Sequence, residues 1–166
     1  QLMYTPAADW TGGGEVRLVI AYGNARQSRL VARDALRLSQ PRFDSDVGGE
    51  WLYWLEGRPA QAGRQVVMRR RVGPGGLTAA AEEVTHAGVN VRTRVHEYGG
   101  GDYCVSRGRV FYSDFADQRV YAGRAGEPGG FVALSPGGAA WADCVVSPDA
   151  RWLVAVEERA RPGGEP

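Results

Sequence analysis

Short apolar runs separated by glycine and proline constrain the fold of this 166-residue chain more than any other feature. The runs are rich in valine, tyrosine and tryptophan, and 24 glycines and 9 prolines are spread among them. Aromatic and β-branched residues favour strands, whereas glycine and proline end strands and form tight turns. The pattern therefore predicts strands at Glu50–Arg58, Arg64–Val72, Asp102–Gly108, Arg109–Phe115, Gln118–Arg124, Gly130–Pro136, Ala142–Pro148 and Arg151–Glu158.

One segment, Ser28–Leu38, has apolar residues at the spacing of a helix. The sequence therefore leaves room for one short helix near the N-terminus. We expect residues 1–42 to form an N-terminal extension that contains this helix, and residues 43–166 to form the β-rich part of the chain.

Three of the predicted strands resemble one another. The runs GEWLYWL, GRVFYSD and ARWLVAV align with Trp51, Val110 and Trp152 in register, at intervals of 59 and 42 residues. An interval near 42 fits one four-stranded blade of a β-propeller, which buries both of its faces only when neighbouring blades stack against it. The sequence therefore predicts an all-β fold, a partial β-propeller of about two to three antiparallel blades, truncated within a blade. The residues before Asp102 account for the longer interval.

The charge balance argues against binding to nucleic acid or to a membrane surface. All 20 basic residues are arginine, and 19 acidic residues leave a formal net charge of +1. Proteins that bind nucleic acid or membranes normally carry a clustered basic face. No apolar run approaches the roughly 20 residues of a membrane helix, and the N-terminus lacks the layout of a signal peptide. We therefore expect a cytoplasmic location.

Motifs for nucleophilic catalysis, metal binding and nucleotide binding are absent from the sequence. It contains no G-x-S-x-G, and His96 and Glu97 are not followed by the second histidine of a zinc site. The glycine stretches run into strands, and the chain has no lysine to bind a phosphate. We expect no cofactor and no metal. Cys104 and Cys144 lie in apolar contexts and are predicted to be buried free thiols, with a disulfide between them as the alternative.

Five polar residues, Arg92, Arg94, His96, Glu97 and Tyr98, lie within seven positions of one loop. Guanidinium groups bind carboxylates and a glutamate binds an ammonium group, so these residues are candidates to face a substrate. The alternative is that the two arginines and the glutamate pair with one another and brace a connection between blades.

The stretches WLYWLEGRPAQAGRQVVMRR, NVRTRVHEYGGGDY and VFYSDFADQRVY together resemble the N-terminal propeller of bacterial prolyl oligopeptidase-family serine peptidases, the group of dipeptidyl aminopeptidases and acylaminoacyl peptidases. The resemblance spans roughly Tyr22 to Pro166, and VRTRVHEYGGG is its most specific part. It implies a propeller followed by an α/β-hydrolase domain with a Ser-Asp-His triad, in a protein that hydrolyses peptides or acyl-peptides. The propeller would gate substrate access, and the chain alone would be inactive because the catalytic motifs lie outside it.

The resemblance also implies partners. In a full-length parent these are a peptide substrate and the C-terminal α/β-hydrolase domain. An incomplete propeller exposes strand edges, so we further expect self-association. The alternative function is a stand-alone propeller-like module that binds a protein without catalysis. The alternative architecture is a complete small β-rich domain whose edges are capped by residues 1–42.

Overall fold

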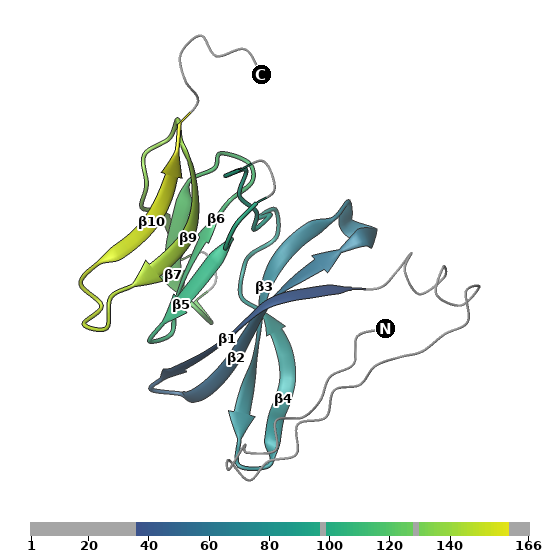
Figure 1. Cartoon of the computed structure of the whole chain (residues 1–166). Helices are drawn as coiled ribbons and strands as arrows, with labels where there is room; N and C mark the ends of the chain where they lie inside the picture. Colours follow the sequence, from purple (N-terminus) through teal and green to yellow (C-terminus); the bar gives the residue numbers. More distant parts are fainter. Residues whose placement is uncertain (1–35, 97–98, 128–129, 160–166) are drawn as a thin grey trace, which may run out of the picture.

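The computed structural model of the chain describes residues 36–96, 99–127 and 130–159. These residues form three antiparallel sheets of four, four and two strands, which follow one another along the chain (Figure 1). Neighbouring strands within each sheet are consecutive in sequence, as in the blades of a propeller. The predicted fold class, an all-β partial β-propeller, is therefore confirmed. We name the sheets blade 1, blade 2 and blade 3 in chain order.

Each blade is a meander with short turns. Blade 1 contains β1 (Arg37–Asp46), β2 (Gly49–Arg58), β3 (Arg64–Gly73) and β4 (Gly76–Glu83), and a single 3-10 turn, η1 (Pro59–Gln61), joins β2 to β3. Blade 2 contains β5 (Tyr103–Ser106), β6 (Arg109–Ser113), β7 (Val120–Arg124) and β8 (Val132–Ala133), and blade 3 contains β9 (Ala140–Val146) and β10 (Leu153–Glu158).

All eight predicted strands are present, as β2, β3 and β5 to β10, with ends that differ by a few residues. Two further strands, β1 and β4, do not follow from the sequence pattern. The sequence of β4 is GLTAAAEE, and the strand is exposed along its whole length, so it lacks the apolar alternation of a half-buried strand. Its pairing with β3 holds it in the sheet.

Most of the helix predicted over Ser28–Leu38, residues 28–35, lies outside the described residues. Its last two residues are not helical, because Arg37 and Leu38 begin β1 and pair with Gly57 and Glu56 of β2. Strand β1 also runs across the expected boundary between residues 42 and 43.

The three similar runs lie at the second strand of each blade, and Trp152 directly precedes β10. The predicted register of the middle run is wrong, however. Equivalent residues of stacked blades point in the same direction around the propeller. Trp51 of blade 1 and Val110 of blade 2 instead point toward each other's blade, because both pack into the cluster between these blades. Leu153 packs toward blade 2, so Trp152 lies on the outer face of blade 3, where it is 66% exposed. Trp51 and Trp152 are thus equivalent, and the repeat in blade 2 is displaced by one residue.

Two apolar clusters hold the blades together. The first lies between blades 1 and 2 and includes Tyr53 and Leu55 of β2, Val67 of β3, and Tyr103 and Tyr112 of blade 2. All five side chains are almost completely buried. Burial of such side chains stabilises a fold by about 1.5–3 kcal/mol each relative to exposure, so this interface contributes substantially to stability.

The second cluster lies between blades 2 and 3 and contains both cysteines, together with Phe111, Val120 and Ala122. Cys104 of β5 and Cys144 of β9 are buried free thiols, as predicted. The neighbouring Cys144 side chain and burial raise the pKa of the Cys104 thiol. The pair therefore contributes to the packing between two blades.

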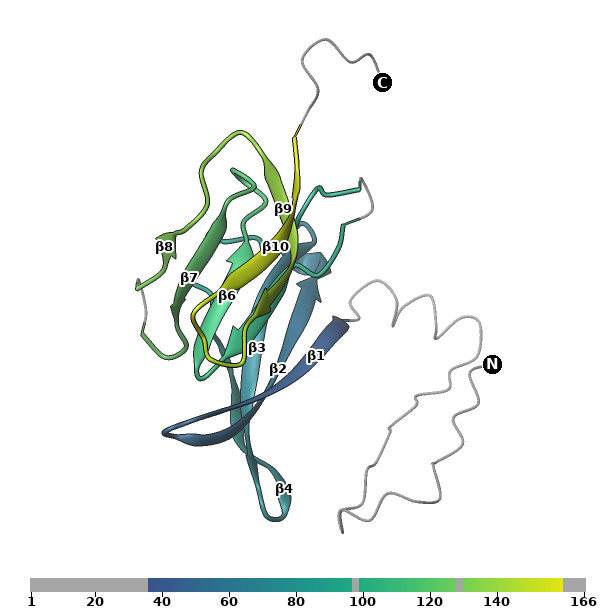
Figure 2. The same cartoon turned by 60° about the vertical axis from the view of Figure 1, so that its left-hand side comes forward.

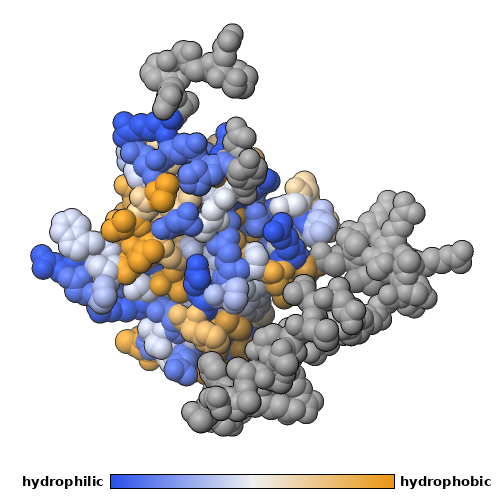
Figure 3. All heavy atoms as spheres, in the orientation of Figure 1, coloured by the Kyte–Doolittle hydropathy of each residue, from blue (hydrophilic) through white to orange (hydrophobic). Residues whose placement is uncertain are grey.

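The first strands of the blades lie next to one another. Strand β5 contacts both β1 and β9, so blade 2 lies between blade 1 and blade 3 (Figure 1, Figure 2). The outer face of blade 3 is apolar and exposed, with Val145, Trp152, Val154 and Val156 on its surface. Hydrophobic residues are visible over this blade in Figure 3.

Candidate functional site

The predicted site residues lie on the segment between β4 and β5, residues 84–102, which we call the β4–β5 connection. It is not a free loop. The amide of Val91 donates to the carbonyl of Gln65 at 2.8 Å, and the amide of Arg92 donates to the carbonyl of Ser113 at 3.0 Å. These bonds hold the connection between β3 of blade 1 and β6 of blade 2, so the backbone at Val91 and Arg92 has a fixed position at the interface.

A buried carboxylate lies at the end of the connection. Asp102 is only 6% exposed. One of its oxygens accepts from the amide of Thr93 at 2.7 Å, and the other accepts from Gln40 Nε2 at 2.8 Å. In return, the amide of Asp102 donates to Gln40 Oε1 at 3.1 Å. Burial raises the pKa of Asp102, against the lowering effect of the hydrogen bonds from Thr93 and Gln40.

Blade 3 holds the same stretch from the other side. The amide of Gly101 donates to Asp143 Oδ1 at 2.7 Å, and the amide of Asp143 donates to the carbonyl of Gly101 at 2.9 Å. Gln40 in β1 and Asp143 in β9 occupy corresponding irregularities of their strands, with φ values of 52° and 55°. Positive φ at these bulges aims each side chain at the neighbouring blade. The end of the connection is therefore clamped by the first strands of blades 1 and 3.

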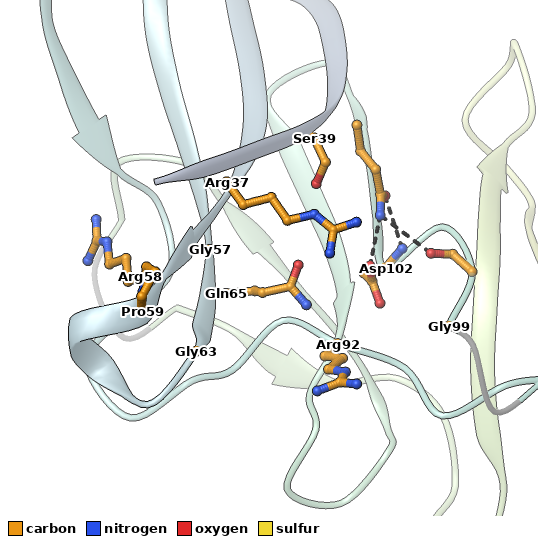
Figure 4. Close-up of a pocket in the computed structure, with 12 residues that line it drawn as sticks. Arg37, Ser39, Gly57, Arg58, Pro59, Gly63, Gln65, Arg92, Gly99 and Asp102 are labelled. Carbon is orange, nitrogen blue, oxygen red and sulfur yellow. Dashed lines mark hydrogen bonds between the residues drawn. The ribbon is translucent and has the colours of Figure 1, made fainter. Parts of the chain in front are cut away.

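A polar cleft of about 510 Å³ opens beside this clamp (Figure 4). In Figure 4 the guanidinium group of Arg37 extends into the cleft between Gln65 and Asp102, whereas Arg58 points away. We call this cavity the Arg37–Arg92 cleft. It is lined by Arg37, Ser39 and Gln40 of β1, by Gly57, Arg58, Pro59, Gly63 and Gln65 around the β2–β3 turn, and by Arg92, Gly99, Gly100 and Asp102 of the connection.

The two arginines of the predicted site share an aromatic partner but line different cavities. The guanidinium carbons of Arg92 and Arg94 lie 5.2 Å and 4.5 Å from the ring centroid of Phe115. Stacking of this kind fixes the plane of a guanidinium and leaves its N–H groups free to donate in that plane. Arg92 lines the Arg37–Arg92 cleft, whereas Arg94 lines a second cavity of about 370 Å³ that also contains Asp117 and Glu158.

The remaining predicted residues lie on the side of Arg94 or outside the described part of the chain. The amide of His96 donates to a carboxylate oxygen of Glu158 in β10 at 2.7 Å, and His96 has a φ of 56°. Glu97 and Tyr98 are outside the described residues, so their predicted role stays a prediction. The described structure thus brings Arg92 together with Arg37, Gln40 and Gln65, none of which the sequence analysis identified as a site residue.

The arginines at the cleft differ in how their charges are compensated. Arg58 pairs with Glu56 at 2.9 Å and with Glu83 at 2.6 Å. In the described residues, neither Arg37 nor Arg92 has a carboxylate oxygen within 4.0 Å. Their guanidinium groups are therefore the ones with donors left for a ligand.

Residues 36–96, 99–127 and 130–159 contain no group of three or more histidine, cysteine or acidic side chains placed to hold a metal ion. Within the same ranges, no helix has the length and apolar composition needed to cross a membrane.

Consecutive antiparallel blades whose first strands lie together define the described chain as part of a β-propeller. No family model matches the sequence, and no curated protein matches it. Solved structures do. A puromycin-hydrolysing peptidase of Mycobacterium tuberculosis is 36% identical over 76% of this chain, with a TM-score of 0.60. A puromycin hydrolase is 33% identical over 75% of the chain, and a mutant puromycin hydrolase complexed with PGG is 32% identical over 78%, both with a TM-score of 0.53.

These similar structures are prolyl oligopeptidase-family proteins with a propeller domain, and the chain is related to one segment of them. The resemblance found in the sequence is therefore confirmed. The chain spans about a fifth of the length of the structures it matches, namely 19%, 19% and 20%.

Proposed function

We propose that the chain is part of the N-terminal propeller of a serine peptidase that hydrolyses peptides or acyl-peptides. The observation that carries this proposal is the 36% identity to a puromycin-hydrolysing peptidase over 76% of the chain. In such a protein the catalytic residues belong to an α/β-hydrolase domain, which is the partner we propose for this segment. The propeller segment alone binds and screens substrate and does not cleave it.

The Arg37–Arg92 cleft is the part of the segment that we propose faces substrate. Propeller blades surround a central channel. Because β5 contacts both β1 and β9, the first strands of the blades lie on the channel side. Arg37 belongs to β1, and Arg92 and Asp102 belong to the connection that leads into β5. A substrate that passes through the channel would therefore meet these side chains.

Hydrolysis by the whole protein tests the proposal. The reading frame that contains this chain is expressed in full, and the product is assayed with puromycin and with short peptides, because puromycin and PGG are the compounds named for the similar structures. We expect hydrolysis by the whole product and none by residues 1–166 alone. A full-length product without a G-x-S-x-G motif, or one that hydrolyses neither kind of compound, contradicts the proposal.

An apolar groove favours the second function, a binding module without catalysis. The groove is about 380 Å³ in volume and lies on the face of blade 1 that points away from blade 2. Apolar surface of this kind is typical of protein contacts. It is lined by Leu38, Ser39, Pro41, Leu52, Trp54, Arg70, Leu77 and Ala81. A full-length product that binds a protein through this groove and hydrolyses no peptide supports this second function over the first.

A further inference from the structure

The described residues that line the Arg37–Arg92 cleft include several hydrogen-bond donors and one acidic side chain, Asp102. Arg37 and Arg92 line it from different elements, β1 and the β4–β5 connection, and both side chains are exposed. In Figure 4 the Arg37 guanidinium extends into the cleft, whereas the Arg92 side chain lies at its edge. The carboxamide of Gln65 lies beside the Arg37 guanidinium (Figure 4), and no hydrogen bond among the described residues uses that carboxamide. The cleft therefore presents the Arg37 guanidinium and one amide in its interior, and the Arg92 guanidinium at its edge, as donors to a ligand.

Asp102, the one acidic residue among the described residues that line the cleft, already accepts hydrogen bonds. Asp102 accepts hydrogen bonds from Thr93 and Gln40, which use both of its oxygens. Burial raises its pKa, and the charge of Arg92 acts on it in the opposite direction. Asp102 therefore belongs to the wall of the cleft, with its carboxylate oxygens already bonded to Thr93 and Gln40.

A carboxylate matches these donors better than a cation or a neutral group does. Guanidinium groups bind carboxylates through paired, charge-assisted hydrogen bonds. Stacking of Arg92 on Phe115 holds its plane in place before a ligand arrives, which lowers the entropy cost of binding. A volume of about 510 Å³ accommodates the end of a short peptide and falls within the usual range for small-ligand sites.

We propose that the Arg37–Arg92 cleft binds the C-terminal carboxylate of a short peptide, with Arg37 and Arg92 as its charged partners and Gln65 as a further donor. This inference rests on the proposed function, since it names the class of substrate that the propeller segment selects. It replaces the pair expected from the sequence, because Arg94 lines a separate cavity.

Calorimetric titration of the 166-residue chain tests the inference without any variant. The probes are trialanine with a free C-terminus, trialanine amide and inorganic phosphate. We expect trialanine to bind about tenfold more tightly than its amide, because charge-assisted hydrogen bonds to the carboxylate are lost. Phosphate is expected to bind more weakly than trialanine, since it cannot fill the cleft. Equal binding of acid and amide, or phosphate binding as tight as that of trialanine, overturns the inference.

Substitutions then locate the site. Arg37→Gln and Arg92→Gln are each expected to weaken trialanine binding about tenfold and to remove the preference for acid over amide. Arg151→Gln is the matched control, because Arg151 is an exposed arginine on blade 3 that does not line the cleft. Thermal melts by circular dichroism verify that the variants are folded. Unchanged affinity in both cleft variants overturns the inference.

The outcome is separable from that of the proposed function. If the 166-residue chain does not discriminate trialanine from its amide while the full-length product hydrolyses peptides, only the carboxylate site is contradicted. If the 166-residue chain binds trialanine more tightly than its amide but the full-length product hydrolyses nothing, the peptidase function is contradicted and the carboxylate site is supported.

Discussion

Gln40 and Asp102 form a reciprocal hydrogen-bonded pair across the boundary between blades 1 and 2. Gln40 Nε2 donates to the Asp102 carboxylate at 2.8 Å, and the Asp102 amide donates back to Gln40 Oε1 at 3.1 Å. The two residues are 62 positions apart in the sequence. Together with the contact between Asp143 and Gly101, this pair sets the position of the β4–β5 connection and so the shape of the Arg37–Arg92 cleft.

Gln40→Ala is expected to lower the free energy of unfolding by about 1–3 kcal/mol, because it leaves a buried carboxylate oxygen and a buried amide without their partner. Urea unfolding of the chain measures the change. Gln61→Ala is the control, since Gln61 is exposed in η1 and its loss should cost less than about 0.5 kcal/mol. Equal effects of the two substitutions would show that the pair contributes nothing specific to stability.

Asp102 should give stability a defined dependence on pH. Its folded-state pKa lies above the ordinary value of 3.8, so the folded protein keeps this proton to higher pH than the unfolded chain does. The contribution of Asp102 is therefore most favourable below pH 3.8 and decreases as the pH rises toward the folded-state pKa. The difference in unfolding free energy between the wild type and Asp102→Asn, measured across this window, should fall with rising pH. A difference that increases with pH would mean that Asp102 is stabilised as a carboxylate.

Gly101→Ala tests the clamp on the side of blade 3. A Cβ at this position would lie 2.8 Å from Asp143 Oδ1, which is too close, and 3.3 Å from the Asp143 Cα, which is a tight contact. We expect a loss of about 1–3 kcal/mol in unfolding free energy, as for other overpacked sites. Gly75→Ala is the matched control, because a Cβ there meets no atom within 4 Å. If both variants unfold at the same urea concentration, the close approach of blade 3 to the connection is wrong.

The strands with a marked apolar run could be predicted from the sequence, and those held only by pairing could not. Strand β2 contains the apolar run Trp51–Leu55, and one face of it forms the core. Strand β1 contains Pro41, with three polar or charged residues before it and four after it, and its pairing with β2 and its bond to Asp102 appear only in the fold. The alignment of Val110 with Trp51 and Trp152 is wrong for a similar reason, because the composition of a run does not show which of its faces meets the next blade.

The candidate site could be predicted only in part. The sequence identifies Arg92 as a candidate, and Arg92 lines the cleft from the β4–β5 connection, while its substrate-facing role stays a prediction. The other members of the site could not be predicted, because Arg37, Gln40 and Gln65 reach the cleft through the pairing of β1, β2 and β3 and not through proximity in the chain. The local sequence also does not separate Arg92 from Arg94. Both contact Phe115, yet each arginine lines its own cavity.

Two apolar faces at the ends of the blade stack should cause self-association. One is the groove on blade 1, where Leu77 is 46% exposed, and the other is the outer face of blade 3. We expect sedimentation velocity to show association that increases with concentration, and Leu77→Glu to reduce it by placing a charge in the groove. Val47→Glu is the control, because Val47 is fully exposed in the β1–β2 turn and does not line the groove. A wild-type chain that stays monomeric at all concentrations, or equal effects of both variants, contradicts this expectation.

Steady-state kinetics of the full reading-frame product give the most direct test of whether this segment faces the substrate of a peptidase. Arg92→Gln and Arg151→Gln are compared with the wild type, using a short peptide with a free C-terminus. We expect Arg92→Gln to raise KM about tenfold with kcat nearly unchanged, because the lost contact holds substrate and transition state alike, and Arg151→Gln to leave both constants as they are. Hydrolysis with the same KM in Arg92→Gln as in the wild type, or no hydrolysis by the wild type at all, would contradict a substrate-facing role for this segment.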